Sequence, residues 1–266
     1  MAAPRNYLNN KDLLKEIHKS KMSYSSFIDE DSAYYDIIIS KLSDITPEII
    51  QEAKVLRANR LTKQAWENAG KSKLEEHRID VSTISDEDIV FRVMTFDHIP
   101  LDSTRKKNPK TVADSHCKVN FPPFMHYKLR SDGSVQCVGK SHWINGVHNG
   151  HFSTNHGQIS NTLGSMCIKL VERFSSRSNW RGYSYRDEMI GSSLVQLTNV
   201  ILQFNEHKSQ NVFSYASSCV NNVFIRVLNL EKRHQSIRDD LLEQNGLTPS
   251  NTRLNEAINI PTIDDH

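Results

Sequence analysis

Histidine and cysteine side chains are concentrated in the middle of the chain. Eight of the sixteen His and Cys residues lie between positions 116 and 156. They are His116, Cys117, His126, Cys137, His142, His148, His151 and His156. A structural zinc site requires close ligand pairs such as C-x₂₋₄-C and H-x₃₋₅-H, and only His148/His151 and His151/His156 approach that spacing, without a paired cysteine. We therefore favour loop histidines bonded to backbone and water over a zinc site, and predict no metal.

A second candidate for chemistry begins at Asp97 and His98. Residues 97–101 (DHIPL), followed by Asn108 and His116, resemble the start of an HNH nuclease, in which one histidine activates water and other residues hold a metal. The match is loose, because the segments that should form the flanking hairpin are polar or broken by two adjacent prolines. No P-loop, GxSxG or HExxH pattern occurs. We predict no enzyme, and a nuclease using Asp97, His98 and downstream histidines is the alternative.

A third candidate is a predicted helix that carries aromatic and then basic side chains. These residues are Phe213, Tyr215, Phe224, Arg226, Lys232, Arg233 and Arg238. A basic helix face that bears aromatic side chains can hold phosphates while stacking on unpaired bases. Periodicity alone favours a different interpretation, in which Phe213, Phe224 and Val227 belong to a core and the charges to a solvated face. The residues by themselves leave both interpretations open.

The predicted elements around these candidates are mostly helices. Asn9 can cap a first helix, and Thr46 with Pro47 can begin a longer one that ends near Gly70. Residues 85–88 have capping-box spacing, which predicts a brief helix through residues 89–94. Apolar residues then recur every three or four positions over 159–170, 190–204 and 216–230, and a last helix is predicted through residues 237–246. Three successive amphipathic helices favour a compact bundle.

The segment between the predicted helical regions lacks a sustained helical period. Residues 97–157 contain Pro122-Pro123 and a stretch rich in Gly, Asn and His at 139–157, with a possible small hairpin around Asp132 and Gly133. We predict a mainly α fold, with this loop-rich segment inserted before a helical bundle. The expected parts are an N-terminal helical part with the loop-rich segment (1–157), a helical domain (158–247) and a mobile tail (248–266).

Composition restricts the class of protein. The 266 residues are 37% hydrophobic and 24% charged, with a net charge of +2, which is typical of globular proteins and argues against bulk coating of nucleic acid. Apolar runs such as Ile37–Ile39 are far shorter than a membrane helix requires. The four cysteines form no CxxC pair and the first ten residues are polar, so we expect reduced thiols, no secretory leader and no membrane association.

Two stretches at opposite ends of the chain resemble one known family. The stretches RDEMI (186–190), QFN (203–205), KSQNVFSYA (208–216), FIRV (224–227) and EKR (231–233) occur in the order of region two of bacterial sigma factors. Their form is similar to that of the late-transcription sigma factors of large tailed phages. The start NYLNNKDLL (6–14) is also similar to the start of that phage family. The resemblance lies mostly within residues 180–238 and leaves 20–157 unexplained.

The resemblance implies a function and a set of contacts. A phage late sigma factor binds host RNA polymerase core, directs it to a short −10-like promoter element, uses no cofactor, and works in the cytoplasm of the infected bacterial host. The helix over 187–204 matches the segment that docks on the clamp-helices coiled coil of the largest polymerase subunit. The implied polymerase contacts are Asp187, Glu188, Gln196, Asn199, Gln203 and Asn205. The implied DNA contacts are Phe213, Tyr215, Asn221, Asn222 and Phe224 for bases, and Arg226, Lys232 and Arg233 for phosphates.

The sequence departs from a full sigma factor after the predicted domain. No helix-turn-helix is evident after residue 247, so we expect no reading of a −35 element. The phage family instead depends on a DNA-loaded sliding clamp and a coactivator, and its acidic, hydrophobic C-terminal tail binds the clamp. Ile258, Ile260 and Ile263 are the candidates for that contact, without an aromatic anchor. A non-catalytic helical scaffold that binds a protein partner is the third interpretation.

Overall fold

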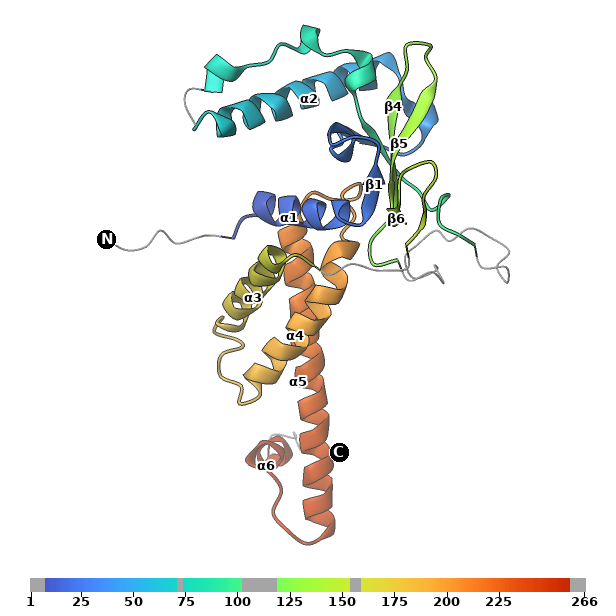
Figure 1. The fold of residues 1–266 in the computed structure, drawn as a ribbon. Helices are drawn as coiled ribbons and strands as arrows, with labels where there is room; N and C mark the ends of the chain where they lie inside the picture. Colours follow the sequence, from blue (N-terminus) through green and yellow to red (C-terminus); the bar gives the residue numbers. More distant parts are fainter. Residues whose placement is uncertain (1–7, 71–73, 102–118, 154–158, 259–266) are drawn as a thin grey trace, which may run out of the picture. The chain divides into compact units, whose positions relative to one another are not determined.

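The computed structural model describes residues 8–70, 74–101, 119–153 and 159–258 (Figure 1). The first of two compact units comprises Met1–Cys167 with Thr198–Tyr215, and the second comprises Ile168–Leu197 with Ala216–His266. The α-helices are α1 (Asn10–Met22), α2 (Pro47–Asn68), α3 (Asn161–Ser175), α4 (Arg186–Val200), α5 (Val212–Gln244) and α6 (Asn251–Ile258). The strands are β1 (Ser25–Phe27), β2 (Ile37–Ile39), β3 (Phe91–Met94), β4 (Phe124–Leu129), β5 (Val135–Ser141), β6 (Trp143–Ile144) and β7 (His151–Phe152).

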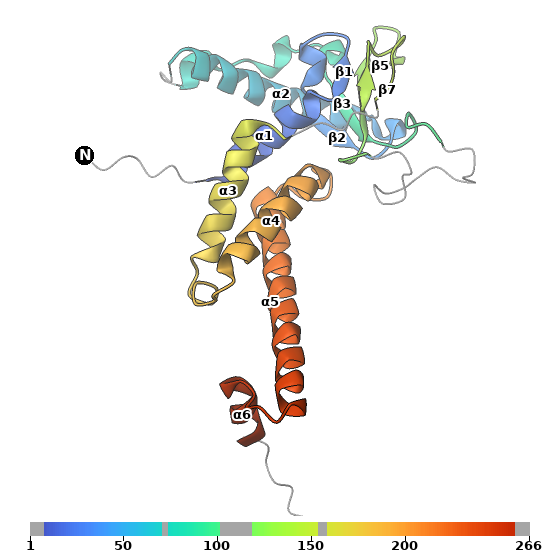
Figure 2. The same cartoon turned by 60° about the horizontal axis from the view of Figure 1, so that its bottom comes forward.

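A five-stranded sheet organises the first unit (Figure 2). Its strand order is β1-β5-β4-β3-β2, and every neighbouring pair is antiparallel except β2 and β3, which are parallel. The strands β6 and β7 form a separate two-stranded ribbon. The fold is therefore mixed α/β with a helical C-terminal region. The prediction of a mainly α protein with at most a small hairpin is wrong.

The sheet was not predicted because β1, β2 and β3 have only three or four residues each and β4 and β5 lack a clean alternation of buried and exposed positions. The predicted capping box at Ser85 does form, but it closes only the 3₁₀ turn η5 (Asp86–Asp88). The next residues form β3 in place of the predicted helix, and its first three residues are all buried because the sheet is covered on both faces. A β-bulge between His126 and Tyr127 also interrupts the period-two pattern of β4.

The predicted turn at Asp132 and Gly133 is present, but it joins two strands of the larger sheet. The backbone N–H of Arg130 donates to the carbonyl of Ser134 at 2.9 Å, and Leu129 pairs with Val135. Gly133 has φ +78°, a conformation that side chains other than glycine adopt at a cost. Asp132 accepts a hydrogen bond from the Ser134 backbone at 2.8 Å, which stabilises the turn.

Helix α2 covers one face of the sheet. Its N-terminus forms as predicted, since the Thr46 hydroxyl accepts a hydrogen bond from the Ile49 backbone and Pro47 occupies the first turn. The core on this face is formed by Ile39, Ala53, Ile89, Phe91 and Val93. The long helix is thereby fixed to the parallel strand pair β2 and β3 by buried apolar side chains.

The other face of the sheet contains a buried arginine. Strand alternation places Arg92 opposite to its neighbours on β3, and its side chain is fully buried. Its guanidinium lies 3.9 Å from the ring centroids of both Tyr35 and Phe124, and its Nε donates to Nε2 of His126 at 2.9 Å. His126 Nδ1 lies 2.6 Å from the carbonyl of Ser32, so the ring proton belongs on Nδ1.

A buried ion pair joins α1 to the segment that follows α4. The Lys21 ammonium donates to Oε1 of Glu206 and to the carbonyl of Phe204, both at 2.7 Å. Lys21 is fully buried and Glu206 is 7% exposed. Burial opposes ionisation of Glu206, but the charges of Lys21, Arg92 and His18 outweigh it and lower its pKa to about 2. This pair holds residues 204–206 against α1 within the first unit.

The core of the second unit is built around three aromatic side chains. Phe224 on α5 packs edge-to-face against Phe174 and Trp180, with ring centroids 5.3 and 5.2 Å apart. On α4, Met189 and Leu197 are fully buried. The buried stripe predicted for α4 is confirmed at Leu197, although the helix ends at Val200 and a 3₁₀ turn, η6 (Ile201–Gln203), continues it.

Helix α5 is longer than the pattern indicated. It runs without a break from Val212 to Gln244, so the predicted separate last helix is its C-terminal half. It ends at Gly246 as expected, where φ is +69° and the Leu247 N–H donates to the Leu242 carbonyl at 2.8 Å.

The residues after α5 also differ from the prediction of a mobile tail. Helix α6 forms over 251–258 and is tied to α5 by polar contacts. The Ser250 hydroxyl and backbone N–H donate to Asp239 at 2.7 and 2.9 Å, and Arg253 pairs with Asp240 at 2.7 Å and Glu243 at 3.0 Å. Within the described ranges, no helix has the length and apolar character needed to cross a bilayer.

Candidate nucleic-acid interface

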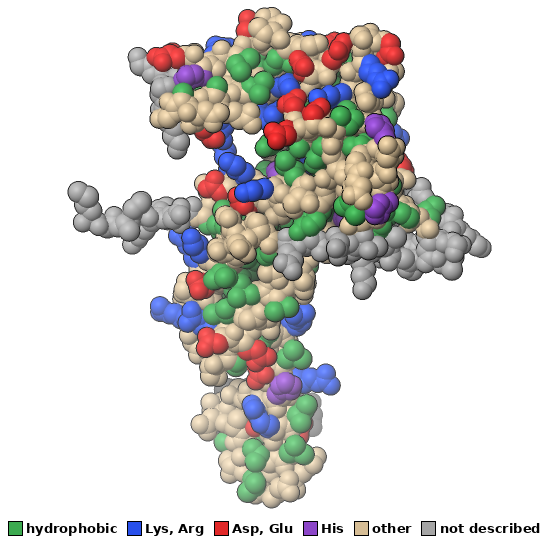
Figure 3. Space-filling model, in the orientation of Figure 1, with side chains coloured by type: hydrophobic (Ala, Val, Ile, Leu, Met, Phe, Trp, Pro, Cys, Tyr) green, Lys and Arg blue, Asp and Glu red, His purple; other side chains and the backbone are tan. Residues whose placement is uncertain are grey.

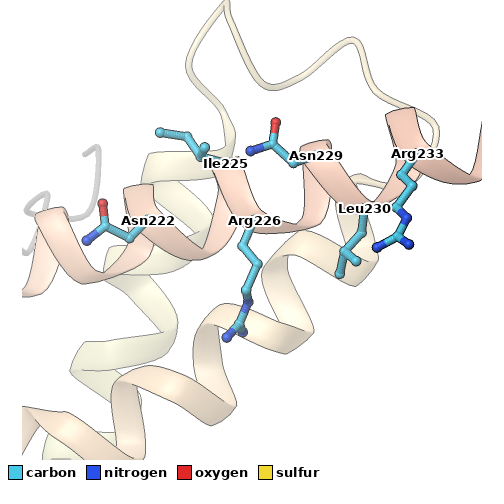
Figure 4. Close-up of a pocket in the computed structure, with 6 residues that line it drawn as sticks. All are labelled: Asn222, Ile225, Arg226, Asn229, Leu230 and Arg233. Atoms are coloured by element: carbon cyan, nitrogen blue, oxygen red, sulfur yellow. The ribbon is translucent and has the colours of Figure 1, made fainter.

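A shallow hollow runs along one exposed side of α5 in the second unit (Figure 4). It is lined by Asn222, Ile225, Arg226, Asn229, Leu230 and Arg233. Residues three, four and seven positions apart fall on the same side of an α-helix, so the lining comes from three turns of one helix. In the close-up, Arg226, Leu230 and Arg233 leave the helix on the same side.

The opposite side of α5 anchors this hollow. Val220, Val223, Phe224 and Val227 are buried among the apolar side chains of the second unit. The backbone beneath the hollow is therefore held by core packing, while the lining side chains remain exposed. A rigid helix with free side chains is a suitable platform for binding an extended ligand.

The chemistry of the hollow is that of a binding surface. Its two guanidiniums, Arg226 and Arg233, form no ion pair with a carboxylate in the described part of the chain. Asn222 and Asn229 provide amide donors and acceptors, and the two aliphatic side chains are about half exposed. The six lining residues offer charged, amide and aliphatic side chains, a combination that can hold phosphates and polar groups.

Three of the predicted DNA contacts lie in this hollow: Asn222, Arg226 and Arg233. Lys232 is also exposed, but at 100° per residue it lies about 120° around the helix from Arg226. Asn221 is half-buried and does not line the hollow. The structure therefore separates Lys232 from the two arginines with which the sequence analysis grouped it.

The predicted aromatic contacts are placed elsewhere. Phe224 is fully buried in the aromatic core, so it is not available to a base. Phe213 and Tyr215 are half-buried and belong to the first unit, not to the unit that holds the hollow. The Tyr215 hydroxyl donates to the Val200 carbonyl at 3.1 Å, and its ring packs against Phe204. Phe224 and Tyr215 therefore have packing roles within the protein.

The predicted polymerase contacts also divide between the two units. Asp187 and Glu188 are exposed in the first turn of α4, where acidic side chains complement the helix dipole. Gln196 is half-buried on the same helix, next to Val195, which is 65% exposed. The remaining three residues, Asn199, Gln203 and Asn205, belong to the first unit. Asn205 accepts from the His207 backbone at 2.9 Å and thus closes a local turn.

Half of the residues that line the hollow, Ile225, Asn229 and Leu230, are not among the predicted DNA contacts. The apolar period over 216–230 placed Leu230 on the buried stripe, but the structure leaves it 46% exposed. The spacing of the lining residues carried the signal, since Asn222, Arg226, Asn229 and Arg233 follow at intervals of four, three and four, the period of one helix face. A search by helical face rather than by residue type would have found them. The same applies to the exposed Val195 on α4.

The histidine-rich segment provides no metal centre among the described residues. No group of three or more His, Cys, Asp or Glu side chains converges there. His98 Nε2 lies 3.0 Å from the carbonyl of Ser141 and donates to it, and His126 is buried beside Arg92. His142 is buried against Phe121, whereas His148 and His151 are exposed.

Several predicted residues lie outside the described ranges. These are Asn108, His116, Cys117 and His156 of the metal and nuclease hypotheses, and Ile260 and Ile263 of the proposed clamp-binding tail. Ile258 is the last residue of α6. Comparisons of the chain with protein-family models, with curated proteins and with solved structures gave no significant match.

Proposed function

We propose that this protein is a sigma-like transcription factor that binds bacterial RNA polymerase core and directs it to a short −10-like promoter element. The observation that supports this proposal is the hollow on α5. There, two arginines that form no ion pair with any described carboxylate share one exposed helix face with two asparagines and two aliphatic side chains. All six residues lie in the segment that resembles the promoter-contacting part of sigma region two, and three of them, Asn222, Arg226 and Arg233, are among the DNA contacts that the resemblance implies.

The dimensions of the hollow suit a nucleic-acid strand. Arg226 and Arg233 are seven residues apart, so their Cα atoms are separated by about 10 Å along the helix axis. This distance is about the axial rise of three nucleotides at roughly 3.4 Å each. Each guanidinium can bind a phosphate, while Asn222 and Asn229 can exchange hydrogen bonds with base edges or sugars. Leu230 and Ile225 offer apolar area to an unstacked base.

The polymerase-binding part of the proposal rests on the resemblance and on α4. In the second unit, the exposed side of α4 combines the acidic residues Asp187 and Glu188 with the exposed Val195. An acidic surface with one apolar anchor suits the binding of a charged helical hairpin such as the clamp helices. A sliding clamp, bound through the C-terminal tail, and a coactivator remain proposed further partners.

The DNA part of the proposal is tested by removing both arginines of the hollow. Promoter complexes should be measured with polymerase core, a −10 fork DNA and either wild-type protein or the Arg226→Ala/Arg233→Ala variant. We expect about 10- to 100-fold weaker complexes, and a salt-dependence slope reduced by about two, because two phosphate contacts are lost. Binding to core alone should not change.

The matched control for this experiment is Lys232→Ala. It removes the same unit charge from the same helix but from a different side. We expect it to retain most of the promoter binding. Equal losses in Lys232→Ala and in either single arginine variant would mean that net charge, not the hollow, drives binding, and would contradict the proposed site.

Polymerase binding is tested by a pull-down with purified core, repeated with core whose clamp-helices coiled coil is disrupted. We expect binding to intact core and loss of binding to the disrupted core. The absence of binding to intact core would overturn the sigma-like function as a whole. In that event, the nuclease hypothesis is tested by incubating wild-type protein and the His98→Ala variant with DNA and divalent metal ions.

A further inference from the structure

The C-terminal half of α5 exposes an apolar stripe. Leu230, Ile237 and Leu241 are 46%, 46% and 52% exposed, and His234 lies between them on the same side. Successive intervals of four, three and four residues are those of a coiled-coil seam. Figure 3 shows apolar side chains interspersed with charged ones on the surface of this part of the chain.

This stripe continues the seam that is buried in the first half of the helix. Ala216, Val220, Val223 and Val227 have the same three-and-four spacing and are all buried within the second unit. One seam therefore extends over about seven turns, covered along its first half and open along its second. A sequence that maintains a coiled-coil seam beyond its own core indicates a helical partner for the open half.

Helix α6 does not cover the open half. Most of its connections to α5 run through Gln235, Asp239 and Glu243, which lie about half a turn away from the centre of the stripe. The remaining ion pair, between Arg253 and Asp240, lies about a quarter of a turn from it. Asp239 is buried by these contacts, whereas Ile237 and Leu241 on the other side stay exposed. Among the described residues, α6 thus packs on the back of the seam.

The charges that flank the stripe indicate which partner fits. With Leu230 and Ile237 at heptad d positions and His234 and Leu241 at a positions, Glu231 and Arg238 occupy e positions. Arg233 and Asp240 occupy g positions. In an antiparallel pair of identical helices, each e position faces an e position and each g position faces a g position.

Antiparallel pairing with a second copy matches all of these charges. Glu231, which contacts His234 of its own helix at 3.2 Å, then faces Arg238 of the second copy. Arg233 faces Asp240 of the second copy, which also pairs with Arg253 of its own chain at 2.7 Å. The two-fold axis thus generates four opposite-charge pairs. The same register places Leu230 against Leu241 and His234 against Ile237. Parallel pairing would instead place Arg233 against Arg238, which is repulsive.

We propose that α5 is a self-association surface, on which two copies of this chain pair their open seams antiparallel. The interface is short, about two heptads, so the dimer is weak and concentration-dependent. The inference does not rest on the proposed function, because it uses the seam and its flanking charges only. Leu230 and Arg233 belong to both surfaces, so a dimer and a bound DNA strand compete for them.

The proposal is tested by sedimentation equilibrium of the full chain at concentrations up to about 1 mM, the weak limit of specific association. The weight-average mass should rise above the 30.5 kDa monomer toward twice that value. Ile237→Asp should abolish this rise while its thermal melt stays close to that of the wild type, because Ile237 is exposed. A monomer throughout, or an unchanged rise in Ile237→Asp, would overturn the proposal.

A charge swap tests the orientation without touching the arginines of the hollow. In the antiparallel dimer, Glu231→Arg and Arg238→Glu should each weaken dimerisation about tenfold, because each creates two like-charge pairs. The double variant should restore it to about the wild-type level. Stronger dimerisation of Arg238→Glu would indicate parallel pairing and contradict the inference. Because Arg226 and Arg233 are intact in these variants, their promoter binding reports separately on the proposed function.

Discussion

At the scale of single residues, the first unit depends on a buried ion pair between Lys21 and Glu206. Each charge is buried at a large desolvation cost, which is offset only while the two groups remain paired at 2.7 Å. Burial lowers the pKa of the Lys21 ammonium, and the nearby Glu206 opposes that shift. The pair connects positions 185 residues apart in the sequence, so it is a tertiary constraint and not a local one.

We predict that Lys21→Met destabilises the fold by about 3–5 kcal/mol, because it leaves the Glu206 carboxylate buried without its partner. Urea unfolding followed by circular dichroism measures the change. The matched control is Lys19→Met, an exposed position on the same helix, which should change stability by less than about 0.5 kcal/mol. Adding Glu206→Gln to Lys21→Met should recover part of the loss, and a further loss would show that the carboxylate is stabilised by other groups.

At the scale of elements, α4 shows how one helix divides its sequence between core and surface. Leu197 is fully buried and Val195, two positions earlier, is 65% exposed. Two residues span about 200° of helix, so these positions lie on opposite sides. The apolar residues of this helix therefore cannot all be core.

The two faces of α4 predict opposite outcomes for the same substitution. Leu197→Asp places an unpaired charge in the core and should cost at least about 4 kcal/mol, enough to unfold a marginal domain. Val195→Asp should change the free energy of unfolding by less than about 0.5 kcal/mol. Thermal melts of the two variants, measured side by side, decide the assignment. A cooperative Leu197→Asp transition at the wild-type midpoint would contradict it.

Helix α5 illustrates a second property of elements. Its first half is held by the aromatic core, whereas its second half carries exposed apolar and charged residues in a regular pattern. Both the proposed DNA-binding hollow and the proposed self-association seam lie on this helix. Its continuity past residue 230 therefore determines which side chains share a face.

At the scale of the whole molecule, stability should depend on pH through its buried histidines. Burial lowers the pKa of His18 and of His98 to about 4, and it lowers the pKa of His126 well below its usual value. Between pH 6.5 and 4 the unfolded chain binds protons that the folded chain does not. Unfolding therefore becomes easier as the pH falls through this window.

We predict that the free energy of unfolding falls by up to about 1.4 kcal/mol per pH unit for each of these histidines between pH 6.5 and 4. Below about pH 4.5, protonation of the unfolded Glu206 adds to the loss, since its folded pKa is about 2. Urea titrations at fixed ionic strength from pH 7 to 4.5 measure the slope. His98→Asn should flatten it, and equal stability at pH 7 and pH 5 would contradict the prediction.

The sequence by itself determined the local features of this protein. The caps at Asn9 and Thr46, the turn at Gly133 and the end of α5 at Gly246 were all predictable, because each depends on a few adjacent residues. The C-terminal helices were also predictable, because apolar residues that recur every three or four positions lie on one face of an α-helix. Three residues of the hollow, Asn222, Arg226 and Arg233, were predicted as DNA contacts from the sequence.

Only the tertiary structure determined how the strands pair, which charged side chains are buried, and which residues line each surface. Strand pairing joins segments tens of residues apart, and short strands buried on both faces carry no alternation by which to detect them. By residue type alone, Arg92 and Lys21 would be assigned to the surface. Both are buried because elements distant in the sequence cover them. Periodicity favoured a core position for Phe224, but only its contacts with Phe174 and Trp180 excluded it from the binding surface. Non-local contacts decide burial, and burial decides which residues are free to bind.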